Sequence, residues 1–204
     1  LGLITINESK AKSFILKNQG LIDAVAKSVS GLVRDADGNL DVYSADNLEK
    51  ILSYKGHLGI SNQDNLTSID ELQYYRNVTG ITLDKNKNLA GKLDFSKYPQ
   101  LVGSIIVQNS PLVTSIDVTG LDKITTFSAT SMKNMTDVTI KGNSKLQTVS
   151  LHHNEALQAV DVRDLPELRL VETYYSKSVT TIKPAGSPKL TSINATSSGS
   201  LSSI

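Results

Sequence analysis

The stretch Leu146-Gln-Thr-Val149-Ser-Leu151-His-His-Asn154 decides the fold of this chain. Its pattern, apolar residues at positions 1, 4 and 6 and an Asn at position 9, occurs again in Val78–Asn86. A shorter form, an apolar residue followed three positions later by another, is found throughout the chain from Leu66 to Ile204 at intervals of eleven or twelve residues. Self-similarity at a fixed period indicates a repeat protein whose coils pack on their neighbours. The first positions of the repeat are Leu66, Val78, Ala90, Val102, Val113, Ile124, Met135, Leu146, Leu157, Leu168, Val179, Leu190 and Leu201.

Alternate units of this repeat differ, so that the full period is two units, or 22–24 residues. This period lies in the range of leucine-rich repeats, and the alternation of apolar residues predicts short strands with those residues facing inward. We assign alternate units to a concave sheet, namely those beginning at Val78, Val102, Ile124, Leu146, Leu168 and Leu190. The units between them are assigned to the convex side.

The ninth position of the longer motif predicts a hydrogen-bonded ladder along the array, because an Asn there can bond the free backbone groups of the turn. Asn86 and Asn154 hold this position. The other equivalents are Ser110, Met132, Ser176 and Ser198. The sequence therefore predicts an incomplete ladder.

The fold class expected from these patterns is an α/β solenoid. It is a leucine-rich repeat, right-handed superhelix of about six coils over residues 61–204, behind a small helical cap over residues 1–60. Helical spacing of Leu21, Val25 and Val29 supports the cap. A second helix is expected over 47–54, where Ser44 and Asp46 offer capping oxygens.

Between these helices lies a loop that resembles the calcium loop of an EF-hand. Its candidate ligands are Asp35, Asp37, Asn39, Asp41 and Asp46. Leu40 occupies the position where a Gly normally makes the sharp turn. The alternative is a hairpin over 33–43 that turns at Asp37-Gly38.

The segment Leu66–Leu83 is similar to the first repeat of bacterial cell-surface leucine-rich repeat proteins, of the internalin-like kind and the related Bacteroidetes surface proteins. The resemblance covers residues 65–204 and implies a secreted or surface-anchored protein that binds or adheres to partners. The array ends in mid-unit at Ile204 with no polar cap, so we expect the natural polypeptide to continue.

Composition narrows the function classes. Lys and Arg number 21 against 20 Asp and Glu, which gives a net charge of +1. This charge produces no positive field strong enough to attract nucleic acid or an anionic membrane surface. No apolar run is long enough to insert into a membrane. Cys is absent and no catalytic or cofactor-binding motif is found, which favours a protein without enzymatic activity or cofactor.

The candidate ligand-binding residues lie on the predicted concave sheet. His152 and His153 stand 22 residues before Tyr174 and Tyr175, so adjacent coils bring the four rings together. Exposed rings with polar atoms suit an extracellular protein partner, with a glycan as the alternative. Glu172, Gln108 and Ile106 are expected nearby in register. No metal site is expected, because consecutive His point to opposite faces of a strand unless a bend intervenes.

Two further alternatives stay open at the level of sequence. The rings can be ordinary cross-strand packing, in which case the chain is a structural spacer without a ligand of its own. An acidic row on the convex side can hold cations or bond nearby turn amides. This row contains Asp70, Asp94, Asp117 and Asp161.

Overall fold

The computed structural model describes residues 19–201. The first eighteen residues of the predicted cap and the last apolar repeat position, Ile204, lie outside the described residues.

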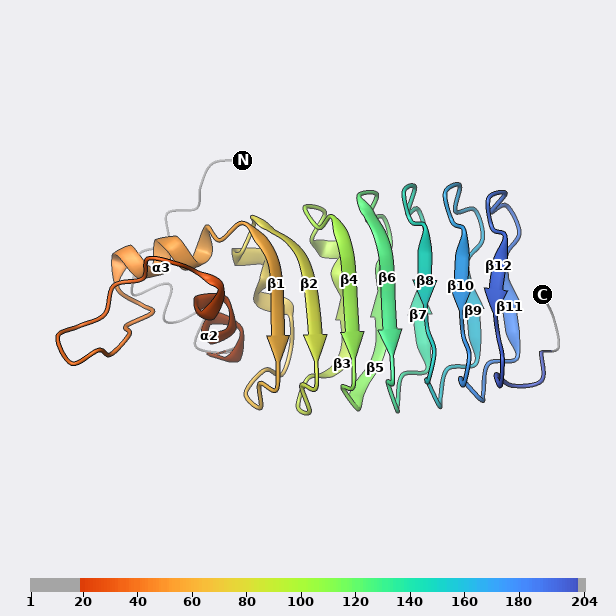
Figure 1. Ribbon diagram of the computed structural model, residues 1–204, viewed down its shortest axis with the longest axis horizontal. Coiled ribbons are helices and arrows are strands. Elements are labelled where there is room, and N and C mark those ends of the chain that lie inside the picture. Colours follow the sequence, from red (N-terminus) through yellow and green to blue (C-terminus); the bar gives the residue numbers. More distant parts are fainter. Residues whose placement is uncertain (1–18, 202–204) are drawn as a thin grey trace.

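Two α-helices form the described part of the cap at one end of the array (Figure 1). Helix α2 (Gln19–Ser28) buries Leu21, Ile22 and Val25, in agreement with the helical spacing of the sequence. Helix α3 (Ala45–Leu52) begins after Ser44, whose side chain accepts a hydrogen bond from the backbone N–H of Asn47. Helix α2 contacts the first strand of the repeat array and thereby covers one end of its core.

The repeats form a parallel β-solenoid of about six turns. One strand of each coil belongs to a seven-stranded parallel sheet, which we call the front sheet. Its strands, in spatial order, are β1 (Gly56–Ser61), β2 (Val78–Asp84), β4 (Gly103–Gln108), β6 (Ile124–Thr130), β8 (Thr148–Ser150), β10 (Leu170–Glu172) and β12 (Ser192–Asn194). These are the units assigned to the concave sheet from the sequence, preceded by β1, which begins inside the predicted 1–60 cap.

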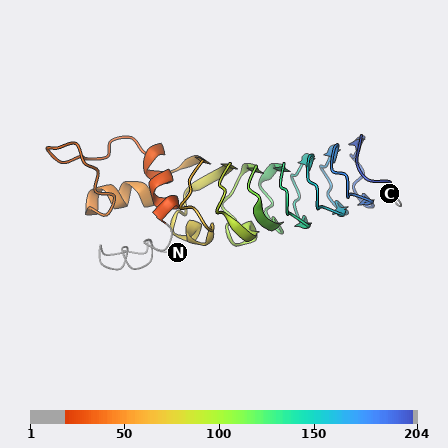
Figure 2. The same cartoon turned by 90° about the horizontal axis from the view of Figure 1, so that it is seen from below.

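The opposite side of the solenoid, which we call the back face, also consists of short strands (Figure 2). Its strands are β3 (Ala90–Asp94), β5 (Leu112–Asp117), β7 (Asp137–Thr139), β9 (Ala159–Asp161) and β11 (Thr181–Lys183). The first two coils add the 3-10 turns η2 (Asp70–Tyr74) and η3 (Phe95–Lys97). Within residues 19–201 both α-helices lie in the cap, so the repeats themselves are built from strands on two sides and not from alternating strands and helices.

Aligned apolar side chains fill the space between the two sides. The register places Ile105, Phe127 and Val149 opposite one another on β4, β6 and β8, and all three are fully buried. The predicted inward positions Ala90 and Val102 are exposed, Val102 by 43%. Leu89 and Leu101 occupy the core in their place.

Two register shifts accompany this one-residue displacement. They fall at Gly91/Lys92 in β3 and at Gly103/Ser104 in β4, in the longer coils near the start of the array. Both glycines have a positive φ, 76° and 77°. At these points the pairing passes over one residue of the next strand, Thr114 of β5 and Thr125 of β6, as in a bulge. The sequence pattern of eleven or twelve residues could not locate the extra residue within each coil.

The predicted ladder of hydrogen bonds is more complete than expected. Asn86 and Asn154 bond the backbone of the preceding coil through both atoms of their amide groups. Ser176 and Ser198 perform part of the same task, since each hydroxyl donates to a backbone carbonyl of the preceding coil. The ladder is interrupted at Met132, whose buried side chain has no polar group, and at Ser110, whose hydroxyl donates to Gln108 of its own coil.

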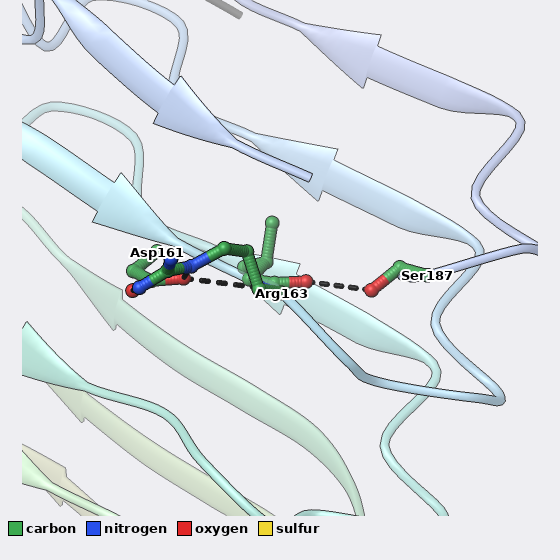
Figure 3. Close-up of polar contacts among 4 residues, drawn as sticks. Asp161, Arg163 and Ser187 are labelled. Atoms are coloured by element: carbon green, nitrogen blue, oxygen red, sulfur yellow. Dashed lines mark hydrogen bonds and ion pairs between the residues drawn. The ribbon is translucent and has the colours of Figure 1, made fainter. Parts of the chain in front are cut away.

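A second ladder, on the back face, was not predicted. The Asn143 amide group donates to the carbonyls of Val118 and Leu121. Two coils later, the Ser187 hydroxyl donates to the carbonyl of Val162 at 2.6 Å (Figure 3). It also accepts from the N–H of Leu165 at 3.0 Å. Asn143 and Ser187 lie 44 positions apart and differ in residue type, so they form no motif that could be recognised in the sequence.

Ser187→Ala is expected to lower the free energy of unfolding by about 1–3 kcal/mol, because it leaves a buried carbonyl and a buried N–H without their partner. Urea unfolding followed by circular dichroism measures the change. Ser144→Ala, at an exposed turn, is the matched control. Equal losses in the two variants would contradict a structural role for the Ser187 hydroxyl.

Candidate functional site

Two rows of residues run along the edge of the front sheet where the strands end. The strand-end row follows the register of the sheet and consists of Ser61, Asp84, Gln108, Thr130, His152, Tyr174 and Thr196. The corner row comprises the next residue in each coil, namely Asn62, Lys85, Asn109, Ser131, His153, Tyr175 and Ser197.

Every residue of the corner row adopts the left-handed conformation, with φ between 53° and 58°. This conformation is uncommon for residues other than Gly and Asn. It persists because the backbone N–H of each corner residue before Ser197 donates to a carbonyl of the next coil. His153 donates to Tyr174 at 3.0 Å and Tyr175 to Thr196 at 2.9 Å. The chain therefore bends sharply after each strand.

This bend brings the side chains of consecutive residues together. His153 does not point to the face opposite His152, as it would in a continuing strand. The Nδ1 atoms of the two imidazoles lie 2.8 Å apart and share a hydrogen bond. Since one nitrogen must donate and the other accept, at least one ring is neutral in this arrangement.

The four predicted rings form one contiguous cluster, which we call the ring cluster. His152 stacks on Tyr174 with ring centroids 4.3 Å apart and planes inclined by 11°. His153 lies 5.1 Å from Tyr175 at 32°, and the remaining neighbours meet edge to face. The sequence prediction that adjacent coils place these four residues in contact is confirmed.

The cluster combines accessible and sheltered surface. Tyr175 is 51% exposed and His153 is exposed, whereas His152 and Tyr174 are half-buried. Burial lowers the pKa of His152 below its ordinary value; the neighbouring His153 imidazole acts in the same direction and Glu172 opposes it. Burial and the neighbouring imidazole thus favour a neutral His152.

The other three predicted residues are placed less closely. Glu172 lies on β10 and accepts a hydrogen bond from the Ser150 hydroxyl at 3.2 Å, next to the rings. Ile106 and Gln108 lie on β4, two coils before His152. Thr130 of β6 stands between Gln108 and His152 in the strand-end row. At about 4.8 Å per strand this separation is roughly 10 Å, too far for direct contact with the cluster.

The Asp35–Asp46 loop folds as the hairpin alternative. Arg34 and Leu40 form an antiparallel bridge, and Gly38 has a positive φ of 82° in the turn. An oxygen of Asp35 accepts the N–H groups of Asp37 and Asn39, as in an Asx-turn, and these bonds hold the Asp35 pKa below its ordinary value. Among residues 19–201 no group of three or more His, Asp or Glu side chains is arranged to hold a metal ion.

The acidic row of the back face bonds turn amides. Asp94, Asp117 and Asp161 each accept the N–H of the residue two positions later. The Arg163 side chain also donates to Asp161, at 2.9 and 2.7 Å, and this lowers the pKa of that carboxyl (Figure 3). Local turn structure therefore explains Asp94, Asp117 and Asp161, three of the four residues of the row.

Comparison with protein-family models and with curated proteins finds no match for this sequence. Over residues 19–201, none of the helices has the length and apolar character needed to cross a membrane. Fold and site geometry are thus the basis for assigning a function.

Proposed function

We propose that this chain is a non-enzymatic binding module of the leucine-rich repeat type, similar to bacterial surface proteins, and that its ring cluster docks an extracellular protein. The array would hold the cluster rigidly and present it to a partner outside the cell. Solenoids suit this task because their strands form a long, regular surface whose outward side chains are free to vary.

One observation carries the proposal: the ring cluster is not needed to build the solenoid. In the other coils, the same two rows hold Ser, Asn, Thr, Gln, Asp or Lys on the same backbone. Thr130 and Ser131 precede the two His by one coil, and Thr196 and Ser197 follow the two Tyr by one coil. Since small polar residues satisfy the fold, four adjacent rings are better explained by recognition than by packing.

The chemistry of the cluster favours a protein partner. Tyr rings give rigid contact area with a hydroxyl at the tip, and they are enriched among residues that dominate binding energy. The half-buried stack of His152 on Tyr174 fixes the central rings before a partner arrives, which limits the entropy lost on binding. The exposed Tyr175 offers the first contact.

The test is binding of the purified chain to panels of extracellular proteins and glycans, with Tyr174→Thr/Tyr175→Ser as the variant. These substitutions copy Thr196 and Ser197 of the next coil, so the fold should tolerate them. We expect the variant to bind a protein ligand roughly 30-fold more weakly, the equivalent of one interface hot spot of about 2 kcal/mol.

Asn109→Ser is the matched control, because it changes the corner row far from the rings and copies Ser131. Equal binding by parent and ring variant would overturn the proposal and favour a structural spacer. If the chain instead binds a glycan and this binding requires Tyr175, the partner is a sugar and not a protein.

A further inference from the structure

We propose that His152 and His153 form a two-nitrogen chelate for a divalent transition-metal ion of the Cu²⁺ or Ni²⁺ type. The proposal does not depend on the protein partner, because it concerns only the imidazoles and the bend between them. It also revises the sequence expectation of no metal site, which assumed a continuing strand.

The first argument is the convergence of the two donor atoms. The left-handed conformation of His153, φ 58°, turns both side chains to the same side, and their Nδ1 atoms approach to 2.8 Å. These atoms share one proton in the present arrangement. If that proton moves to the Nε2 of its own ring, both Nδ1 lone pairs can face one ion while both imidazoles stay neutral. Neutral imidazole nitrogen is a common ligand of these metals.

The separation of the nitrogens points to the class of metal. With metal–nitrogen bonds of about 2.0–2.1 Å, two nitrogens 2.8 Å apart subtend roughly 85–90° at the ion. This angle fits neighbouring positions of a square-planar or tetragonal ion, the geometry of Cu²⁺ and Ni²⁺. A tetrahedral Zn²⁺ site needs about 109° and therefore a separation of about 3.3 Å.

The tyrosines hold the imidazoles in place by their faces. Tyr174 stacks on His152, and Tyr175 tilts over His153. Contacts that fix ligand orientation commonly change metal affinity by about 10–100-fold. The carboxylate of Glu172, which accepts a hydrogen bond from Ser150 next to the rings, carries a negative charge that favours a bound cation. Water would complete the coordination, since His153 is exposed to solvent.

The experiment is isothermal titration of the full chain, without a polyhistidine tag, with Cu²⁺, Ni²⁺ and Zn²⁺. We expect one ion bound per chain and the order Cu²⁺ above Ni²⁺ above Zn²⁺. His153→Asn and His152→Thr are each expected to weaken binding at least about tenfold, since the loss of a direct ligand should exceed the lower limit for a supporting residue. These variants copy Asn109 and Thr130 at the equivalent positions, and thermal melts verify their folding.

The chain provides its own control in His57, the only other His. Its Nε2 is hydrogen-bonded to the Thr82 hydroxyl at 2.8 Å, far along the sheet from the ring cluster. His57→Ser should bind the ion as the parent does, and electron paramagnetic resonance of the Cu²⁺ form should show coupling to two nitrogens. Unchanged affinity in His153→Asn, an equal loss in His57→Ser, or no binding to the parent would each overturn the chelate.

Discussion

Asn154→Ala is expected to lower the free energy of unfolding by about 3–5 kcal/mol, because it deprives three backbone groups of their side-chain partner. The Asn154 amide group donates to the carbonyls of Ala129 and Leu151 at 2.8 and 2.9 Å. Its oxygen accepts the N–H of Met132 at 2.9 Å. All of these bonds are buried, so water cannot replace the lost partner.

Urea unfolding and thermal melts measure this loss, with a fall in Tm of roughly 10 °C. Asn154→Ser is the matched variant, because Ser176 already fills the equivalent position of the next coil and its hydroxyl donates to Leu151. We expect Asn154→Ser to lose clearly less than Asn154→Ala. A loss below about 1 kcal/mol in Asn154→Ala would show that the backbone groups find other partners.

Much of the fold could be predicted from the spacing of apolar residues in the sequence. An apolar residue every eleven or twelve positions specifies which side chains face inward, and alternate units fall on opposite sides of the coil. The front sheet follows this pattern from β2 to β12. The units on the other side of each coil carry the same apolar repeat, and short strands and 3-10 turns occupy that back face, so the expected α/β class is not supported there.

For the candidate site, the sequence predicts only which coils lie next to each other. A spacing of 22 residues places His152 beside Tyr174, and the rings do stack. The left-handed corner at His153 could not be predicted, because the corner row varies from Asn and Lys to His and Tyr and contains no Gly. That conformation is imposed by hydrogen bonds between coils, which depend on tertiary structure and not on the local sequence.

Phe127→Ala is expected to lower the free energy of unfolding by about 3–5 kcal/mol, since it removes the largest side chain of its inward row and leaves a cavity. Phe127 is fully buried on β6, between Ile105 of β4 and Val149 of β8. Close-packed neighbours can collapse only partly into such a space. The expected measurement is urea unfolding, combined with hydrogen exchange of the backbone amides.

The exchange pattern tests the solenoid itself. Because each coil packs only on its neighbours, protection should fall most in β4, β6 and β8 and least in the cap helix α2. Phe127→Ile is the matched control, since Ile105 holds the equivalent position one coil earlier, and it should lose much less stability. An even loss of protection from cap to last coil would instead mean that the array unfolds as one cooperative unit. In that case a substitution in β6 would also unfold the ring cluster. Loss of binding in a core variant would then give no information on the role of the rings.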